Sequence, residues 1–116
     1  MENGTDVTKL YAGDESFPVE IEYKGMLWHF EFKEITWAQK KRVQSESMKR
    51  VVARDGKSEM KMDMEKMYIR MFQLTNTKAP VGFDITKISD EFGEILVKHI
   101  PGMEDVETLD EDEIKN

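Results

Sequence analysis

The chain has 116 residues, of which 39% are hydrophobic and 35% charged, so it is bounded to one small domain with a thin core. It contains no cysteine, which excludes disulfides, thiolate catalysis and cysteine zinc sites and fits a cytoplasmic protein. No apolar run approaches the length of a membrane span, and residues 1–16 lack the basic and apolar regions of a signal peptide.

The net charge of −7 is concentrated at the two ends of the chain. Residues 1–16 carry −3 and residues 101–116 carry −6, which leaves +2 for the middle of the chain. Acidic ends with few apolar residues are typical of disordered segments, and they repel the phosphates of nucleic acids. We therefore expect a flexible segment at 1–16, a single folded domain at 17–100 and an acidic flexible tail at 101–116.

Residues 17–33 carry the clearest local pattern. Apolar and polar side chains alternate on both sides of Lys24 and Gly25, which predicts a β-hairpin closed by a two-residue turn. In that register every inward apolar residue faces another, as Ile21 faces Trp28. A two-stranded hairpin is not stable alone in water, so the helices that follow are expected to cover its aromatic face.

Helical signals follow the hairpin, and the predicted helices span residues 37–54, 59–76 and 87–100. Thr36 is a suitable N-cap for the first helix, and Gln39 completes a capping box. Ser58 is the expected cap of the second helix, and Pro101 ends the third. The predicted fold class is α+β: an N-terminal two-stranded antiparallel β-hairpin packed on a mostly α-helical domain of about three helices, with disordered acidic ends.

The sequence contains no pattern for catalysis or for a cofactor. His29 and His99 lie far apart and lack metal-ligand spacing, so we expect no metal site. The glycines form neither a dinucleotide-binding nor a phosphate-binding loop, and no nucleophile elbow is present. We therefore expect a protein that is not an enzyme and uses no cofactor.

The first predicted helix is the basic element of the chain. Residues 36–57 carry a net charge of +5. The simplest interpretation is a solvated helix face. The alternatives are cover by the acidic tail, or a docking face for an acidic partner that includes Lys40, Lys41 and Arg42.

Five of the nine methionines lie between residues 58 and 72. Met60, Met64, Met67 and Met71 fall at helical spacing and are most simply core residues packed on the hairpin. Other apolar residues widen this stripe, so either the third helix covers the second face or a partner does, because methionine surfaces adapt to varied partners. The partner-binding candidates are Met62, Met67, Ile69, Leu74, Lys40, Lys41 and Arg42.

The order of these elements resembles the small tail assembly chaperones of long-tailed phages and prophages. Members of that family often have a hairpin of alternating apolar residues around a glycine, leading through a Phe-Lys-Glu-Leu-Thr type sequence into a capped helix. The resemblance covers about residues 17–100. The matching residues are Val19, Ile21, Gly25, Trp28, Phe30, Phe32, Lys33, Glu34, Ile35 and Thr36.

The resemblance implies a non-enzymatic chaperone of the host cytoplasm that is absent from the mature virion. It would bind the tape measure protein, with the tail tube protein as a further candidate partner, and keep it soluble during tail assembly. No membrane or specific nucleic acid is implied. Many family members also have a longer, frameshifted form, and an adenine-rich slippery site over Lys115 and Asn116 is the corresponding hypothesis here.

Two other functions remain open at this point. One is a small adaptor or regulatory module whose basic helix 37–54 docks an acidic protein or nucleic acid. The other is a virion tail structural or completion protein. We rank the structural protein lower, because such subunits usually need more strand than a single hairpin.

Overall fold

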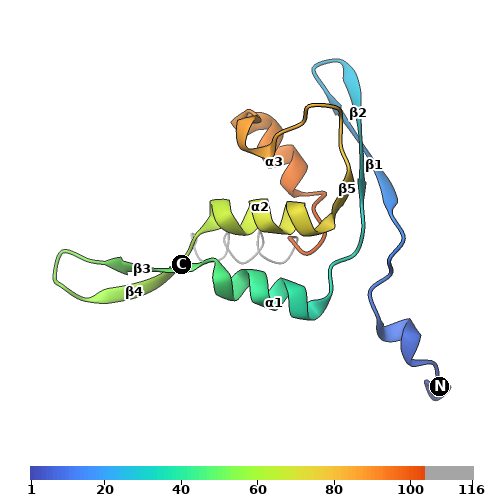
Figure 1. Cartoon of the computed structure of the whole chain (residues 1–116), viewed down its shortest axis with the longest axis horizontal. Helices are drawn as coiled ribbons and strands as arrows, with labels where there is room; N and C mark the ends of the chain where they lie inside the picture. The colour runs from blue at the N-terminus through green and yellow to red at the C-terminus, as the bar shows by residue number, and fades with distance from the viewer. Residues whose placement is uncertain (104–116) are drawn as a thin grey trace.

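In the computed structural model, which describes residues 1–103, a β-hairpin and three helices form a small α+β fold (Figure 1). The hairpin strands are β1 (Phe17–Tyr23) and β2 (Met26–Phe32). Lys24 and Gly25 form the turn with φ values of 53° and 72°, the left-handed conformations that a tight hairpin turn requires. Ile21 pairs with Trp28, as the alternation predicts.

The prediction of a two-stranded sheet is wrong, because a third strand pairs with β2. This strand, β5 (Asn76–Lys78), gives the sheet the order β1-β2-β5. Lys33 N–H donates to the Thr75 carbonyl at 2.8 Å, and the Asn76 amide donates to the Glu31 carbonyl at 3.1 Å. A strand this short has too little alternation to be recognised in the sequence.

The predicted helix 37–54 is wrong in its second half. Helix α1 (Trp37–Glu46) begins with the predicted capping box but ends eight residues earlier than expected. It is followed by β3 (Met48–Val52), which pairs antiparallel with β4 (Ser58–Met62). Val51 and Val52 are β-branched and favour a strand, and the turn between the strands contains Asp55 and Gly56, with Gly56 at φ 83°.

The predicted helix 59–76 begins too early for the same reason. Residues 58–62 belong to β4, and helix α2 (Met64–Thr75) starts after its N-cap, Asp63. The Asp63 carboxylate accepts a hydrogen bond from Lys66 N–H at 3.1 Å, so Asp63 rather than Ser58 satisfies the first turn. The Asp63 N–H also donates to the Ser47 carbonyl at 2.6 Å, which closes the base of the β3–β4 pair.

The predicted helix 87–100 is shorter in the structure. A 3₁₀ turn, η2 (Ile85–Lys87), comes first, and helix α3 (Asp90–Val97) then begins at its N-cap, Ser89. After Val97 the hydrogen bonds tighten to a spacing of three residues, as is common at a helix end. The folded domain also extends beyond residue 100, because Met103 is only 1% exposed. The rest of the predicted tail, residues 104–116, lies outside the described residues.

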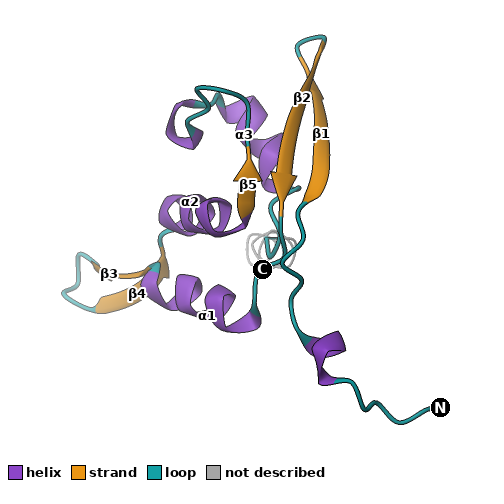
Figure 2. Cartoon of the chain, turned by 45° about the vertical axis from the view of Figure 1, so that its right-hand side comes forward, coloured by secondary structure: helices purple, strands orange, loops and turns teal. Residues whose placement is uncertain are grey.

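The core lies between one face of the sheet and the helices (Figure 2). Alternate residues of the hairpin point into it, so that Phe30 contacts Phe83 edge to face with ring centroids 5.2 Å apart. Helices α2 and α3 supply the other side of this core. Its buried apolar members are Ile21, Phe30, Phe32, Val43, Met67, Met71, Phe72, Phe92, Leu96, Ile100 and Met103.

The N-terminal segment extends away from this core (Figure 1). It contains one 3₁₀ turn, η1 (Val7–Leu10), with no buried residue. Hydrogen bonds connect it to the rest of the described chain: Gly13 N–H donates to the Glu34 carboxylate at 2.9 Å, and Ser16 donates to Thr77 at 2.8 Å. The flexibility of residues 1–16 remains a prediction.

Candidate protein-interaction surfaces

Two exposed turns each contain a carboxyl group with a shifted pKa. Asp6 and Asp84 are the N-caps of the 3₁₀ turns η1 and η2. Hydrogen bonds from the hydroxyls of Thr8 and Thr86, and then from their backbone N–H groups, lower the pKa of these carboxyls below the usual value. Turn formation accounts for both shifts, so neither indicates a reactive site.

Among residues 1–103, no group of three or more histidine, aspartate or glutamate side chains is placed to hold a metal ion. No helix in this part of the chain has the length and apolar character needed to cross a bilayer.

The most prominent surface is a two-stranded ribbon that projects beyond the helices (Figure 1). We define the ribbon as β3, β4 and their connecting turn, residues 48–62. Within the described chain neither strand pairs with a third, so each has one edge with unpaired backbone groups. Such edges are available for pairing with a partner chain.

One face of the ribbon is apolar. Because paired residues point to the same side, Met48, Val52, Met60 and Met62 share this face with Arg50 and Ser58. Val52 and Met60 are 67% and 57% exposed, and Met48 is also exposed. Met62, at the base, is partly buried against the core. The ribbon therefore presents apolar side chains to solvent that the rest of the described chain does not cover.

The ribbon is also basic. Residues 48–62 contain five lysine or arginine residues and two acidic ones, a net charge of +3. Lys49 and Lys61 pair with each other on the face opposite the apolar one, and Arg50 pairs with Met60. Like charges directly opposite one another weaken a strand pair, so the facing lysines lower the stability of the ribbon.

A second surface is a groove between α2 and α3, which we call the α2–α3 groove. It has a volume of about 290 Å³. Leu96 and Ile100, both 1% exposed, form its floor, while Ile69 is partly buried in its wall. The acidic residues that line it are Glu65, Asp90 and Glu94, and no lysine or arginine is among the lining residues.

A third hollow, of about 370 Å³, lies between the tip of the hairpin and the loop before η2. Its walls are aromatic, with Tyr23, Trp28 and Phe83 among them. Trp28 donates its indole N–H to the Tyr23 carbonyl at 3.1 Å, and the Tyr23 hydroxyl is 3.1 Å from that of Ser89. Both polar ends of these rings are thus satisfied within the fold.

The apolar residues proposed from the sequence as a partner site do not form one surface. The assignment of Met67 is wrong: it is fully buried and belongs to the core. Met62 and Leu74 are partly buried and pack against that core. Ile69 lines the α2–α3 groove and is the member of this set that remains a good candidate for contact with a partner.

The basic residues of the proposed site lie on α1. Lys40 is partly buried, and its side chain is close to the position that a Cβ atom on Gly102 would take. Lys41 and Arg42 are exposed, and the Lys41 ammonium lies 6.0 Å from the ring centre of Trp37. These residues are separated from the basic residues of the ribbon by the end of α1, so the predicted continuous basic helix does not exist.

Sequence reasoning missed Met48, Val52 and Met60 as the exposed apolar set. Met60 was expected in the core because it continues the helical spacing of Met64 and Met67. The sequence also contains a signal for a hairpin in place of the helix, because an Asp-Gly turn flanked by alternating residues is a strong hairpin indicator.

Comparison with protein-family models, curated proteins and solved structures finds no significant match. The resemblance to phage tail assembly chaperones therefore depends on the sequence pattern of residues 17–100 alone.

Proposed function

We propose that this protein is a non-enzymatic tail assembly chaperone that binds the tape measure protein and keeps it soluble in the host cytoplasm. The observation that carries the proposal is the apolar face of the ribbon, where Met48, Val52 and Met60 are exposed along a projecting two-stranded arm. Exposed apolar residues gathered on one face are typical of interaction sites.

The geometry of the ribbon suits a helical client of variable sequence. Methionine side chains are flexible and polarizable, so they repack against different apolar surfaces. Arg50, in the middle of the same face, adds a cation beside these apolar side chains. Covering Val52 and Met60 would favour binding by roughly 1.5–3 kcal/mol for each side chain that becomes fully buried.

The proposal predicts that a tape measure protein is encoded downstream, and the test is co-expression of the two proteins. We expect the tape measure protein to remain in the soluble fraction and to co-purify with the chaperone. Replacing Val52 and Met60 with serine should return it to the insoluble fraction, because the apolar face is lost without a change in net charge.

The matched control replaces Glu59 and Lys61 with serine on the opposite face of the ribbon, also without a change in net charge. This variant should solubilise the client as well as the wild-type protein does. If the wild-type protein fails to solubilise the tape measure protein, the proposed function is wrong. If both double variants behave alike, the apolar face is not the binding surface.

The charge of the ribbon supports a second candidate, an adaptor that docks an acidic protein or a nucleic acid. Lys49, Arg54, Lys57 and Lys61 would then make the main contacts, in place of the predicted basic helix 37–54. Such binding falls steeply as salt is raised, whereas apolar contact does not. Measuring partner binding at low and high salt separates the two candidates.

The third candidate is a virion tail structural or completion protein, a class that usually needs more strand than a single hairpin. The structure contains a three-stranded sheet and a second strand pair. No surface described above favours this candidate over a chaperone. Detection of the protein in purified virions would support it and would contradict the chaperone proposal.

A further inference from the structure

The α2–α3 groove combines an apolar floor with a rim of a single charge sign. Leu96 and Ile100 form the floor, and partly buried residues of α2 and η2, among them Ile69 and Ile85, form the walls. Its volume of about 290 Å³ is at the lower limit for small-molecule pockets, which run from about 300 to 1,000 Å³. The space fits one or two apolar side chains of a peptide better than a cofactor.

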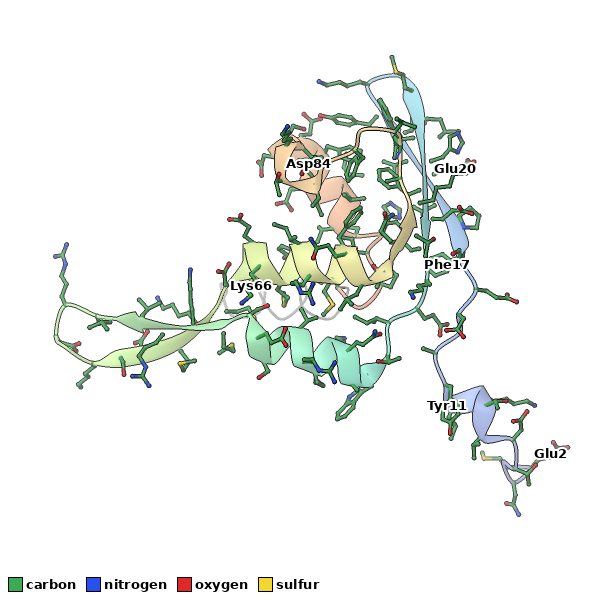
Figure 3. All side chains as sticks on the ribbon, viewed as in Figure 1. Glu2, Tyr11, Phe17, Glu20, Lys66 and Asp84 are labelled. Carbon is green, nitrogen blue, oxygen red and sulfur yellow. The ribbon has the colours of Figure 1, made fainter. Side chains whose placement is uncertain are left out.

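The rim charges come from exposed carboxylates on both sides of the groove. Glu65 is in the first turn of α2, while Asp90 and Glu94 are on α3. Asp84 caps the turn that contains Thr86, a lining residue, but Lys87 in the same turn is a cation close to Asp84, so this pair adds no net charge to the rim. Lys66 lies next to Glu65 on α2 (Figure 3), but it does not line the groove.

We propose that the α2–α3 groove binds a basic amphipathic segment of the client, with an apolar side chain against Ile69 and Leu96 and lysine or arginine residues beside Glu65 and Glu94. This inference deepens the proposed function, on which it depends, by giving the chemistry of the segment that is recognised. The apolar contact supplies affinity, and the carboxylates select a basic segment over an acidic one.

The experiment uses two fluorescent amphipathic peptides with leucines at the same helical positions. One carries lysine and the other glutamate on the polar face. Fluorescence anisotropy with the full-length protein should show that the lysine peptide binds at least about tenfold more tightly than the glutamate peptide. Ile69→Asp should abolish this binding, and it should leave the fold intact because Ile69 lies outside the buried core.

A charge-reversed pair of variants tests the role of the rim. Glu65→Lys combined with Glu94→Lys should reverse the preference, so that the glutamate peptide binds more tightly. The control combines Glu22→Lys with Glu46→Lys, which changes the net charge equally at exposed positions on β1 and at the end of α1. This control should keep the preference of the wild-type protein for the lysine peptide.

The inference is overturned if the two peptides bind equally, if Ile69→Asp binds as the wild-type protein does, or if the control also reverses the preference. The outcomes for the two proposals are separable. A protein that solubilises the tape measure protein but shows no peptide preference would overturn the groove alone. A protein that shows the peptide preference but fails to solubilise the tape measure protein would overturn the proposed function.

Discussion

Met67 and Met60 are seven residues apart and have opposite environments. Met67 is fully buried among the core residues of α2, while Met60 is 57% exposed on the ribbon. The same side chain therefore acts as core filling at one position and as accessible apolar surface at the other.

This difference predicts that alanine lowers the free energy of unfolding far more at Met67 than at Met60. Met67→Ala should lower the free energy of unfolding by about 2–5 kcal/mol, because it removes buried methylene groups and leaves a cavity. Met60→Ala should change it by less than about 0.5 kcal/mol, as is usual for exposed positions. Urea unfolding followed by circular dichroism measures both, and comparable costs for the two variants would contradict the assignment of Met67 to the core.

Two glycines differ in the effect that alanine should have on stability. Gly102 has φ of +90°, and a Cβ atom there would lie 3.1 Å from a methyl group of Ile35, so Gly102→Ala should destabilise the fold by about 1–3 kcal/mol. Gly93 is inside α3, where an added Cβ would make an ordinary 3.5 Å contact with Ile88. Gly93→Ala should stabilise the protein by up to about 1 kcal/mol, since alanine favours a helix over glycine.

The melting temperatures of these two variants give the comparison directly. The expected result is a lower value for Gly102→Ala and an equal or higher one for Gly93→Ala. A neutral effect at Gly102 would show that the chain does not cross so close to Ile35.

Among the elements, the start of α1 follows local chemistry closely. Thr36 accepts a hydrogen bond from Gln39 N–H at 3.0 Å, and the Gln39 side chain accepts one from Thr36 N–H at 3.1 Å. Both ends of this capping box are within four residues, so the sequence alone predicts it. The hairpin β1–β2 is equally local, because its turn and its alternation set the register.

The ribbon and β5 are the elements that the sequence did not reveal. Residues 58–72 fit two periods at once, since Met60 and Met62 alternate as in a strand while Met60, Met64 and Met67 recur as in a helix. The local turn at Asp55 and Gly56 favours the pairing of β3 with β4 over a helix that begins at residue 59. The extent of β5 depends on pairing with β2, a contact distant in sequence.

The N-cap of α2 can be tested by substitution. Asp63→Ala should lower the free energy of unfolding by about 1 kcal/mol, because the carboxylate that accepts from Lys66 N–H is lost. Ser58→Ala, at the cap position expected from the sequence, should cost less than about 0.5 kcal/mol. Chemical denaturation of both variants decides between the two helix starts, and a larger cost at Ser58 would favour the earlier one.

At the scale of the whole molecule, the ribbon is separable from the body. Its strands pair mainly with each other, and its base is closed by the hydrogen bond between Asp63 and Ser47. Replacing residues 49–61 with an Asn-Gly turn between Met48 and Met62 should change the free energy of unfolding by less than about 1 kcal/mol, because an isolated strand pair is only marginally stable.

Thermal unfolding and near-ultraviolet circular dichroism of this shortened protein measure the prediction. The body should keep its tertiary signal and its cooperative transition, while solubilisation of the tape measure protein is lost. Loss of the cooperative transition would show that the ribbon is part of the folding unit.

The candidate surfaces depend on this global arrangement, so the sequence indicated them only in part. Ile69 was identified because it lies outside the main apolar stripe of α2. The acidic rim could not be anticipated, since Glu65 and Glu94 come together only when α3 packs beside α2. The exposure of Val52 does not follow from the sequence pattern, because that pattern predicts a continuous helix over residues 37–54.

The exposed turn of the ribbon also makes the chain divisible. Trypsin cleaves after lysine and arginine, and Arg54 and Lys57 lie in this turn, far from the core. The two pieces would carry β1–β2–α1–β3 and β4–α2–β5–α3, and both the central sheet and the contact between α1 and α2 would hold them together. A nicked protein should therefore remain one particle, and two separately expressed fragments should reconstitute it, which makes this turn a natural position for a split reporter.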